Sequence, residues 1–380
     1  MGDIDRSRSH KVKAIFIIGL NDGVFPSVRK DEGFLNDADR EILKQDGIEL
    51  AKGTIDKLYE DNFNIYKAFT TAEERLYLSY PSSDMQGKAL RPSMLINKIK
   101  KIYMSEQFEM IAKTFQGLEE ILAEELTALG ANDIQIGRRM VSFTGDKRMM
   151  YKANFCLRTA IRILKPIKNF TAKDADEVYN QIQAIPWEEY LDVNKTFAID
   201  AVVFSDEFRH SKFVSYKVKD AIVDYFRDKT GKRPSVRINN PDVLLNIHIA
   251  QTTCTLSLDS SGESLHRRGY RQEAVEAPLN EVLAAGMILM TGWRGECDLI
   301  DPMCGSGTIP VEAALIAKNI APGVFRKGFA FEKWVDFDAD MFDEIYNDDS
   351  QEREFAHKIY GYDNNPKANE IATHNIKAAG

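Results

Sequence analysis

The sequence predicts a multidomain protein of α/β and α+β folds that ends in the first part of a nucleotide-binding α/β domain. Three observations lead to this prediction. Residues 14–18 (Ala-Ile-Phe-Ile-Ile) form a strand-like apolar run that enters a Gly- and Asn-rich turn. Between residues 108 and 258, short alternating strand patterns flank amphipathic helical patterns. Residues 298–314 join an apolar strand, a Gly-rich turn and an Ala-rich helix, as in open α/β sheets that bind nucleotides.

The composition is that of an ordinary globular protein. The chain has 380 residues, of which 44% are hydrophobic and 28% charged, and its length is typical of two to four domains. No apolar run approaches the ~20 residues of a membrane helix, and the N-terminus lacks the apolar stretch of a signal peptide. The cysteines are scattered without a CxxC pair (Cys156, Cys254, Cys297 and Cys304). We therefore expect a cytoplasmic protein with no metal site, no disulfide framework and no membrane contact.

Charge is segregated along the chain, whose formal net charge is −8. Residues 197–271 hold 12 Lys and Arg against 9 Asp and Glu, whereas residues 330–380 hold 5 against 12. Because nucleic-acid footprints are local, an acidic chain can still meet phosphate through its basic middle part. The acidic tail is expected to face solvent or a cationic partner.

Residues 1–103 combine the strand at 14–18 with a second strand expected at 75–80 and helices expected at 37–45, 56–69 and 92–103. This piece resembles a helicase-like α/β fragment of the AddB-type component of the bacterial ATP-dependent helicase–nucleases, on residues 2–8, 19–26 and 66–78. Working helicases of that superfamily carry Thr-Arg-Ala where this chain has Thr70-Thr71-Ala72, and no GxxxxGK[ST] loop is present. The resemblance therefore implies contact with DNA without ATP hydrolysis.

The pattern changes abruptly at Tyr103–Glu106, where no Gly-, Ser- or Pro-rich linker intervenes and Met104 looks like an internal start. We expect residues 1–103 to fold as a body separate from the rest. A fused or misassembled reading frame explains the join better than a natural functional fusion.

Residues 104–170 predict a ferredoxin-like unit. A strand at 108–114 precedes a helix at 117–126 that ends before Gly130, and a hairpin follows at 134–136 and 139–143. Further on, strands are expected at 197–204, 245–249 and 254–258, with a helix over 208–226 between the first two. These apolar positions are explained by packing and receive no chemical role.

Basic side chains gather at the start and on one face of the helix at 208–226, namely Arg209, Lys212 and Lys219. A helix N-terminus already carries positive partial charge, so such residues are reasonable there if they meet an anion such as phosphate. A solvated basic face is the alternative. The runs His210-Ser211-Lys212 and Val218–Ile222 resemble the THUMP domain, an RNA-binding module, which we assign to residues 171–262.

The segment that follows, 265–271, brings together three arginines and a tyrosine, Arg267, Arg268, Tyr270 and Arg271. Guanidinium groups bind phosphates and an aromatic ring can stack on a base, so the segment is a candidate contact with single-stranded RNA. A charged interdomain linker is the alternative.

Residues 298–314 (DLIDPMCGSGTIPVEAA) are the most informative stretch. Gly305 and Gly307 allow backbone to approach a ligand without an intervening Cβ, and the helix N-terminus directs free N–H groups toward it. Asp301 ends the strand. Asp363 ends the next strand, within Tyr360–Pro366, where a carboxylate can accept both hydroxyls of a ribose.

The stretch is similar to motif I of class I (Rossmann-like) methyltransferases, with residues 361–366 as the second motif and residues 277–289 as the helix over the cofactor. Together with residues 265–271 it resembles the large-subunit rRNA guanine-N2 methyltransferases of the RlmL type. The resemblance covers residues 104–380 and assigns 263–380 to a partial methyltransferase domain. It implies S-adenosyl-L-methionine as cofactor, guanine N2 of 23S rRNA as substrate, and cofactor contacts from Asp301, Pro302, Cys304, Gly305, Ser306, Gly307, Thr308, Asp363 and Asn364.

Family members also carry an Asn-Pro-Pro-Tyr loop that holds the target base, and this sequence contains no such run. We therefore expect no catalytic residue in this chain and no methyl transfer by the chain as written. The alternatives are a fragment of the DNA-repair helicase–nuclease and an RNA-binding module without turnover.

Overall fold

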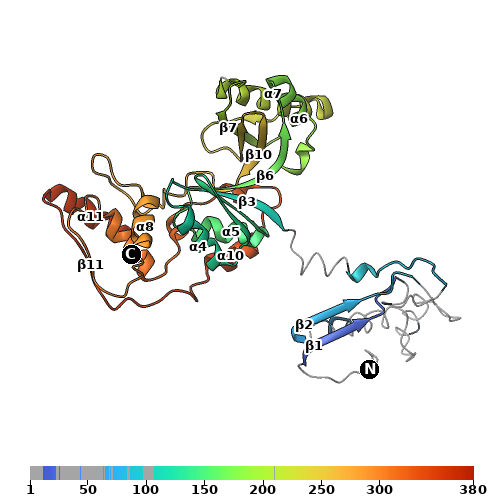
Figure 1. Ribbon diagram of the computed structural model, residues 1–380, viewed down its shortest axis with the longest axis horizontal. Helices are drawn as coiled ribbons and strands as arrows, with labels where there is room; N and C mark the ends of the chain where they lie inside the picture. Colours follow the sequence, from blue (N-terminus) through green and yellow to red (C-terminus); the bar gives the residue numbers. More distant parts are fainter. Residues whose placement is uncertain are drawn as a thin grey trace. The chain divides into compact units, whose positions relative to one another are not determined.

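In the computed structural model the chain divides into two compact units, Met1–Ser105 and Glu106–Gly380. The structure describes residues 12–22, 72–83, 86–96, 107–208 and 210–380, together with Phe25, Leu43, Phe63, residues 65–67 and Phe69. Figure 1 labels the helices and strands of both units. No helix of the described residues is long and apolar enough to cross a membrane.

The first unit contains two parallel strands, β1 (Val12–Ile18) and β2 (Ala72–Ser79). Its small core includes the buried side chains of Ile17, Leu20 and Ile96. These two strands confirm the strands expected at residues 14–18 and 75–80. The helices expected at 37–45, 56–69 and 92–103 lie largely outside the described residues.

The second unit is built on one continuous eight-stranded sheet, in the order β4-β5-β3-β6-β10-β9-β7-β8. Strand β6 is shared between its two halves, because residues 162–164 pair with β3 and residues 164–171 pair with β10. The sheet therefore runs without a break from the ferredoxin-like part into the THUMP part. Its strands are β3 (Phe108–Lys113), β4 (Asn132–Gly137), β5 (Met140–Gly145), β6 (Arg162–Thr171), β7 (Thr196–Phe204), β8 (Ser235–Val236), β9 (Val243–Ala250) and β10 (Thr253–Asp259).

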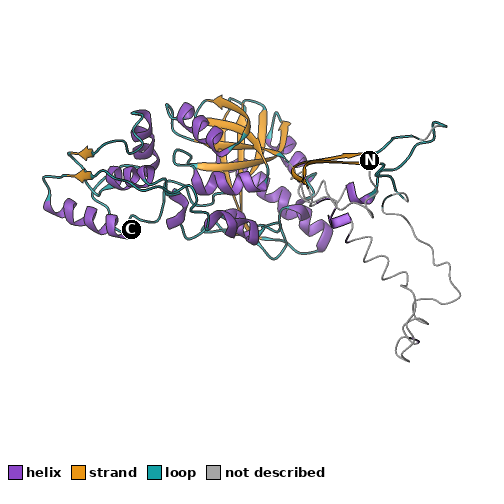
Figure 2. Cartoon of the chain, turned by 90° about the horizontal axis from the view of Figure 1, so that it is seen from below, coloured by secondary structure: helices purple, strands orange, loops and turns teal. Residues whose placement is uncertain are grey.

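Helices pack against both halves of this sheet (Figure 2). The ferredoxin-like half carries α4 (Glu119–Leu129) and α5 (Lys147–Cys156), and the THUMP half carries α6 (Ala175–Gln183), the short η2 (Trp187–Glu189) and α7 (Ser211–Thr230). Helix α4 ends at Gly130 in the left-handed conformation that glycine adopts most readily. Helix α7 buries Val218 and Ile222, as its apolar periodicity predicts.

The last part of the chain forms a strand–turn–helix arrangement. Two short parallel strands, β11 (Leu299–Asp301) and β12 (Ile359–Gly361), lie beside α8 (Glu281–Met290), α9 (Thr308–Ala317) and α11 (Pro366–Ala378). Ala285 and Ile288 of α8 pack against Ala313 and Ile316 of α9. This confirms the strand, Gly-rich turn and helix expected over 298–314. The mixed α/β class predicted from the sequence is also confirmed.

Residues 319–358, between α9 and β12, leave this arrangement and pack against the ferredoxin-like part. They contain η3 (Pro322–Phe325), η4 (Ala330–Lys333) and α10 (Ala339–Tyr346). The fully buried ring of Phe331 stacks on Tyr151 of α5, with ring centroids 4.4 Å apart. Phe342 meets the same tyrosine edge-on at 5.8 Å. An aromatic cluster therefore joins the methyltransferase-like part to α5.

Ion pairs at the same interface explain part of the charge segregation. Asp336 pairs with Lys147 at 2.9 Å and Glu344 pairs with Arg148 at 2.7 Å. Both cations belong to the first turn of α5. These two acidic residues of the C-terminal part thus face cations of the same chain, which is one of the two outcomes expected for the acidic tail.

Removal of the central aromatic ring should destabilise the second unit. Phe331→Ala is expected to lower its free energy of unfolding by about 3–5 kcal/mol, the usual cost of emptying a buried phenylalanine site. Urea unfolding followed by circular dichroism measures this change. Phe204→Ala is the control, since Phe204 is 67% exposed and should change stability by less than about 0.5 kcal/mol. A similar loss in both variants would show that the aromatic cluster does not join the two parts.

Candidate cofactor and RNA sites

The carboxyl ends of β11 and β12 lie side by side and bring two sequence motifs together. Asp301 is the register partner of Gly361. The backbone N–H of Tyr362 donates to the carbonyl oxygen of Asp301 at 2.8 Å, and that of Cys304 donates to the carbonyl oxygen of Tyr362 at 2.8 Å. The turn at 302–307 therefore faces residues 362–364, as the two-motif prediction requires.

Asp363 holds the glycine-rich turn directly. One of its carboxylate oxygens accepts from the backbone N–H of Gly305 at 3.0 Å, and the other accepts from the backbone N–H of Asn365 at 2.9 Å. Asp363 thus contacts Gly305, a role that the sequence did not predict. Each oxygen has a further lone pair with which it can accept from a ligand hydroxyl.

The two glycines of the turn have different surroundings. Both have left-handed φ angles, +53° at Gly305 and +81° at Gly307. A Cβ at Gly307 would lie 3.2 Å from the Cβ of Ala372 on α11, whereas a Cβ at Gly305 would meet only Val275 at 3.8 Å. The missing side chain of Gly307 therefore makes room for α11, and a contact between Gly307 and the cofactor stays a prediction.

Asp301 carries the clearest indication of a ligand. Its side chain is 7% exposed, and one carboxylate oxygen accepts from the backbone N–H of Met303 at 3.0 Å. The other oxygen is buried and has no hydrogen-bond partner. A buried carboxylate oxygen without a donor is costly, and this one lies at the turn. The turn therefore fits a ligand that brings a donor such as an ammonium group.

The remaining cofactor candidates divide by exposure. Pro302 and Asn364 are exposed, whereas Cys304, Ser306 and Thr308 are buried. Burial, together with the negative charges of Asp301 and Asp363, raises the pKa of the Cys304 thiol. A raised pKa disfavours the thiolate, so Cys304 is not suited to act as a nucleophile, and its contact with the cofactor stays a prediction.

Asn375 is a site residue that the sequence reasoning missed. It is fully buried on α11, and its amide donates to the carbonyl oxygens of Ser306 and Glu273, both at 2.9 Å. It thus joins the turn to the segment before α8. Its position on the buried face formed by Ala368, Ile371 and Ala372 was a usable indication, because a polar residue on such a face must find partners.

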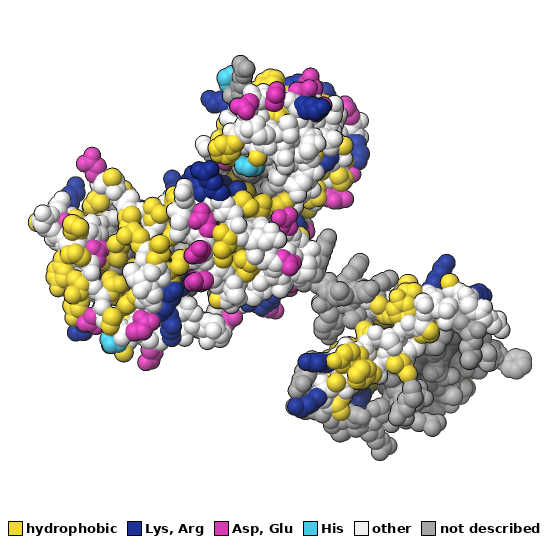
Figure 3. Space-filling view, in the orientation of Figure 1, with side chains coloured by type: hydrophobic (Ala, Val, Ile, Leu, Met, Phe, Trp, Pro, Cys, Tyr) yellow, Lys and Arg dark blue, Asp and Glu magenta, His cyan; other side chains and the backbone are white. Residues whose placement is uncertain are grey.

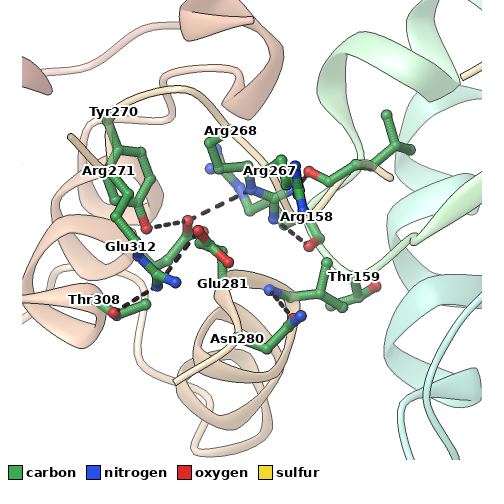
Figure 4. Close-up of polar contacts among 12 residues, drawn as sticks. Arg158, Thr159, Arg267, Arg268, Tyr270, Arg271, Asn280, Glu281, Thr308 and Glu312 are labelled. Carbon is green, nitrogen blue, oxygen red and sulfur yellow. Dashed lines mark hydrogen bonds and ion pairs between the residues drawn. The ribbon is translucent and has the colours of Figure 1, made fainter. Parts of the chain in front are cut away.

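Two predicted RNA contacts are corrected by the structure. Arg268 and Tyr270 are each only 2% exposed. Arg268 donates to the carbonyl oxygens of Leu265 at 2.7 Å and Arg158 at 2.5 Å, and the Tyr270 hydroxyl donates to Glu312 at 3.0 Å (Figure 4). Burial and these internal partners leave neither side chain available to RNA in this structure. For Arg268 and Tyr270, the structure agrees better with the alternative given above, in which residues 265–271 form an interdomain linker.

The other two candidates of this segment differ from each other. Arg267 is exposed and pairs with Glu263 at 2.7 Å, so it keeps access to a phosphate. Arg271 is mostly buried and donates to the carbonyl oxygen of Leu279 at 2.6 Å and to the hydroxyl of Thr308 at 2.9 Å. Arg271 therefore contacts the start of α9 and the segment before α8, and it does not lie on a surface for RNA.

The first turns of α7 form the remaining candidate RNA surface. Lys212 is exposed in the first turn, as predicted, and Lys219 pairs with Asp220 at 2.8 Å. Arg209 lies outside the described residues. The rings of Phe213 and Tyr216 are 53% and 59% exposed on the same turns. Cations beside exposed aromatic rings can hold phosphates and stack on bases.

Apolar side chains gather on the face of the unit that carries α8, β11 and α11 (Figure 3). The exposed ones include Met287, Met290, Ile300 and Tyr362. A separate cavity of about 760 Å³ lies among α4, the end of α5 and residues 345–353, and no residue of the turn lines it. Within the part of the chain that the structure describes, no group of three His, Cys, Asp or Glu side chains could hold a metal ion.

Comparison with protein families gives three successive matches along the second unit. Residues 109–164 match the RlmL ferredoxin-like domain, residues 172–259 the THUMP domain, and residues 268–380 the RMKL-like methyltransferase domain. The fold and the glycine turn thus define a methyltransferase-type chain with an attached THUMP module.

Solved structures agree. The chain is 30% identical to SMU.472, assigned as a methyltransferase and solved with SAH, with a TM-score of 0.65 over 73% of this chain and 74% of that one. It is 31% identical to a predicted N6-adenine-specific DNA methylase from Listeria monocytogenes, with a TM-score of 0.66 over 76% and 75% of the two chains. The chain therefore belongs to the family of THUMP-containing methyltransferases with an RMKL-like methyltransferase domain.

Curated relatives carry a more specific name. The chain is 42% identical over 286 residues to the ribosomal RNA large subunit methyltransferase K/L of Syntrophotalea carbinolica, and 40% identical over 271 residues to that of Marinomonas sp.. These alignments cover 73% and 70% of this chain. The chain spans only 40% and 38% of the lengths of these two relatives. The helicase-like assignment of residues 1–103 stays a prediction, since the family matches lie within residues 109–380.

The two glycines should respond differently to alanine. Each substitution places a side chain at positive φ, which costs roughly 1–2 kcal/mol, but only that at Gly307 also forces α11 to move. Gly307→Ala is therefore expected to lower the thermal unfolding midpoint more than Gly305→Ala does. Differential scanning calorimetry of the two variants provides the comparison, and the reverse order would contradict the assigned role of Gly307.

Proposed function

We propose that this chain acts in the S-adenosylmethionine-dependent methylation of the exocyclic N2 of a guanine in 23S rRNA. The observation that carries the proposal is the buried Asp301 oxygen without a partner, at a glycine turn formed by the ends of two parallel strands. The family assignment and the SAH-bound relative support a methyl donor of this chemistry. The names of the curated relatives support ribosomal RNA as the substrate.

The residues of the turn have distinct parts in this proposal. Asp301 accepts a hydrogen bond from the ammonium group of the cofactor, and Gly305 lets backbone approach it without a Cβ. Asp363 accepts from the ribose hydroxyls while it holds the turn through Gly305. The exposed Pro302 and Asn364 border the site, Ser306 lies in the turn, and Thr308 begins the helix behind it. S-adenosylmethionine, when bound, supplies an electrophilic methyl group.

The RNA side of the proposal rests on the THUMP part. Lys212 and Lys219 of α7 contact phosphates, and Arg209 is proposed with them on the basis of its sequence position. Phe213 and Tyr216 offer rings for stacking. Arg267, which is exposed, is proposed as a further phosphate contact.

Two other functions remain to be weighed. A module that binds RNA and cofactor without turnover would use the same residues of the turn and of α7. Incubation with labelled S-adenosylmethionine and undermodified 23S rRNA separates the two, since only an enzyme transfers label to guanine. A role in DNA repair is not favoured, because it relies on residues 1–103 alone.

The cofactor assignment predicts a specific effect of Asp301. Asp301→Asn removes the charged acceptor, which should weaken S-adenosylmethionine binding by roughly tenfold or more, because a hydrogen bond to a charged group contributes about 1.5–3 kcal/mol. Isothermal titration calorimetry measures the affinity. Asp298→Asn is the matched control, at the other end of the strand, where Asp298 accepts from the backbone N–H of Lys358. Equal affinity in the wild-type chain and the Asp301 variant would rule out the assignment.

The RNA assignment predicts a change in salt dependence. Replacing Lys212 and Lys219 together by Ala should weaken binding to 23S rRNA fragments and reduce the slope of log affinity against log salt by about 0.7–0.9 for each lost phosphate contact. Filter binding at several salt concentrations gives this slope. Lys327→Ala, an exposed lysine in the loop between η3 and η4, should leave the slope unchanged. An unchanged slope in the double variant would remove α7 from the RNA surface.

A further inference from the structure

Arginines from other segments contact α9 at three points: its first residue, its middle and the segment just past its end. At its first residue, Thr308 accepts from Arg271 at 2.9 Å. One turn later, Glu312 accepts from Tyr270 at 3.0 Å and pairs with Arg268 at 3.5 Å. Just past its end, the carbonyl oxygen of Ile320 accepts from Arg158 at 2.9 Å. Figure 4 shows the side chains at the first two points gathered in one place.

These contacts come from two parts of the chain. Arg158 follows α5 in the ferredoxin-like part, where its own backbone N–H and that of Thr159 donate to Glu125 of α4 at 2.9 and 3.0 Å. Arg268 also donates to the backbone oxygen of Arg158. The linker at 265–271 therefore binds the ferredoxin-like part with two residues, Leu265 and Arg268, and binds α9 with three. Gly269 lets the linker pass close to the backbone oxygen of Phe325.

Arg271 also brings the starts of two helices together. The same nitrogen that donates to Thr308 donates to the carbonyl oxygen of Leu279, at 2.6 Å, and lies 3.3 Å from the carboxylate of Glu281 in the first turn of α8. A cation between two helix N-termini is unfavourable by itself, since both carry positive partial charge. Glu281, which is almost fully buried, offsets it.

A buried ion cluster is a costly way to pack and contributes little net stability. Arginines and carboxylates of this cluster also retain atoms without a hydrogen-bond partner, which adds to the cost. The cluster is better explained by the fixed geometry that it gives to α9. The glycine turn immediately precedes Thr308, so the position of α9 sets the position of the turn.

We propose that Arg158, Arg268 and Arg271 form a positioning clamp on α9 that fixes the glycine turn relative to the ferredoxin-like and THUMP parts, with Arg271 as its decisive member. The purpose of the clamp rests on the proposed function: methyl transfer needs donor and acceptor held within about 3–3.5 Å, and a 1 Å error can cost about a hundredfold in rate. The RNA is held by one part and the cofactor by the other, so the clamp sets the distance between them.

The test compares Arg271→Ala, Thr308→Val and their double variant with Lys327→Ala, which changes the exposed lysine of the loop between η3 and η4. Amide hydrogen exchange over residues 302–311 reports on the turn without any cofactor, because the N–H groups of Met303, Cys304, Gly305 and Gly307 are hydrogen-bonded there. Both single variants should speed this exchange roughly tenfold and weaken S-adenosylmethionine binding by a similar factor. The double variant should add little to the effect of Arg271→Ala, because both changes remove the same hydrogen bond between Arg271 and Thr308. Lys327→Ala should match the wild-type chain in both measurements.

A rescue variant separates positioning from stability. Arg271→Ala leaves the Glu281 carboxylate buried without its cation, which alone should lower the unfolding midpoint. Adding Glu281→Gln removes that charge, so it should restore the midpoint but not the slow exchange of the turn or the cofactor affinity. Recovery of all three would overturn the proposal, as would wild-type exchange in Arg271→Ala. If the wild-type chain binds no S-adenosylmethionine, the proposed cofactor fails, while the exchange experiment still decides the clamp.

Discussion

A single carboxylate with no exposed surface constrains the arrangement of the second unit. Glu312 lies in the middle of α9, a helix that is otherwise apolar on most of its faces. A charge in that position must be paired, because an unpaired buried ion is far costlier than the helix could tolerate. Its partners, Arg268 and Tyr270, come from the linker before α8. The linker is thereby bound to α9, and through Arg158 both are bound to the ferredoxin-like part.

A second set of contacts, made by aromatic rings, also binds the methyltransferase-like part to the ferredoxin-like part. The segment after α9 returns to α5, where Phe331, Phe337 and Phe342 pack around Tyr151. Burial of aromatic rings contributes stability, whereas the ion cluster contributes defined geometry. The pair β11–β12 is too short to be stable alone, so the packing of α8, α9 and α11 and the contacts with the ferredoxin-like part must hold it. The three segments that match separate family models therefore form one compact unit, Glu106–Gly380.

Local features were predictable from the sequence and long-range partners were not. The strands at 108–113 and 243–250, the end of α4 at Gly130 and the turn at 302–307 follow from periodicity and glycine positions, which depend on neighbours along the chain. Arg268 and Tyr270 were expected to meet RNA because guanidinium groups bind phosphates and aromatic rings stack on bases. Their burial depends on Glu312, more than forty residues away. Glu312 itself gave the available indication, as a charge on an apolar helix.

The same reasoning explains why the glycine turn was found correctly but understood incompletely. Gly305 and Gly307 look equivalent in a GxG pattern, yet a Cβ at Gly305 would meet only Val275 at 3.8 Å, whereas one at Gly307 would meet Ala372 of α11 at 3.2 Å. The GxG pattern indicates that these two positions lack side chains, and it does not indicate whether a ligand or another part of the chain fills the space. Asp363 was likewise placed at a strand end by its spacing, while its bond to the Gly305 amide could be seen only with both strands in position. A motif in one sequence therefore identifies which residues meet, and the packing of α9 and α11 around them determines what each one does.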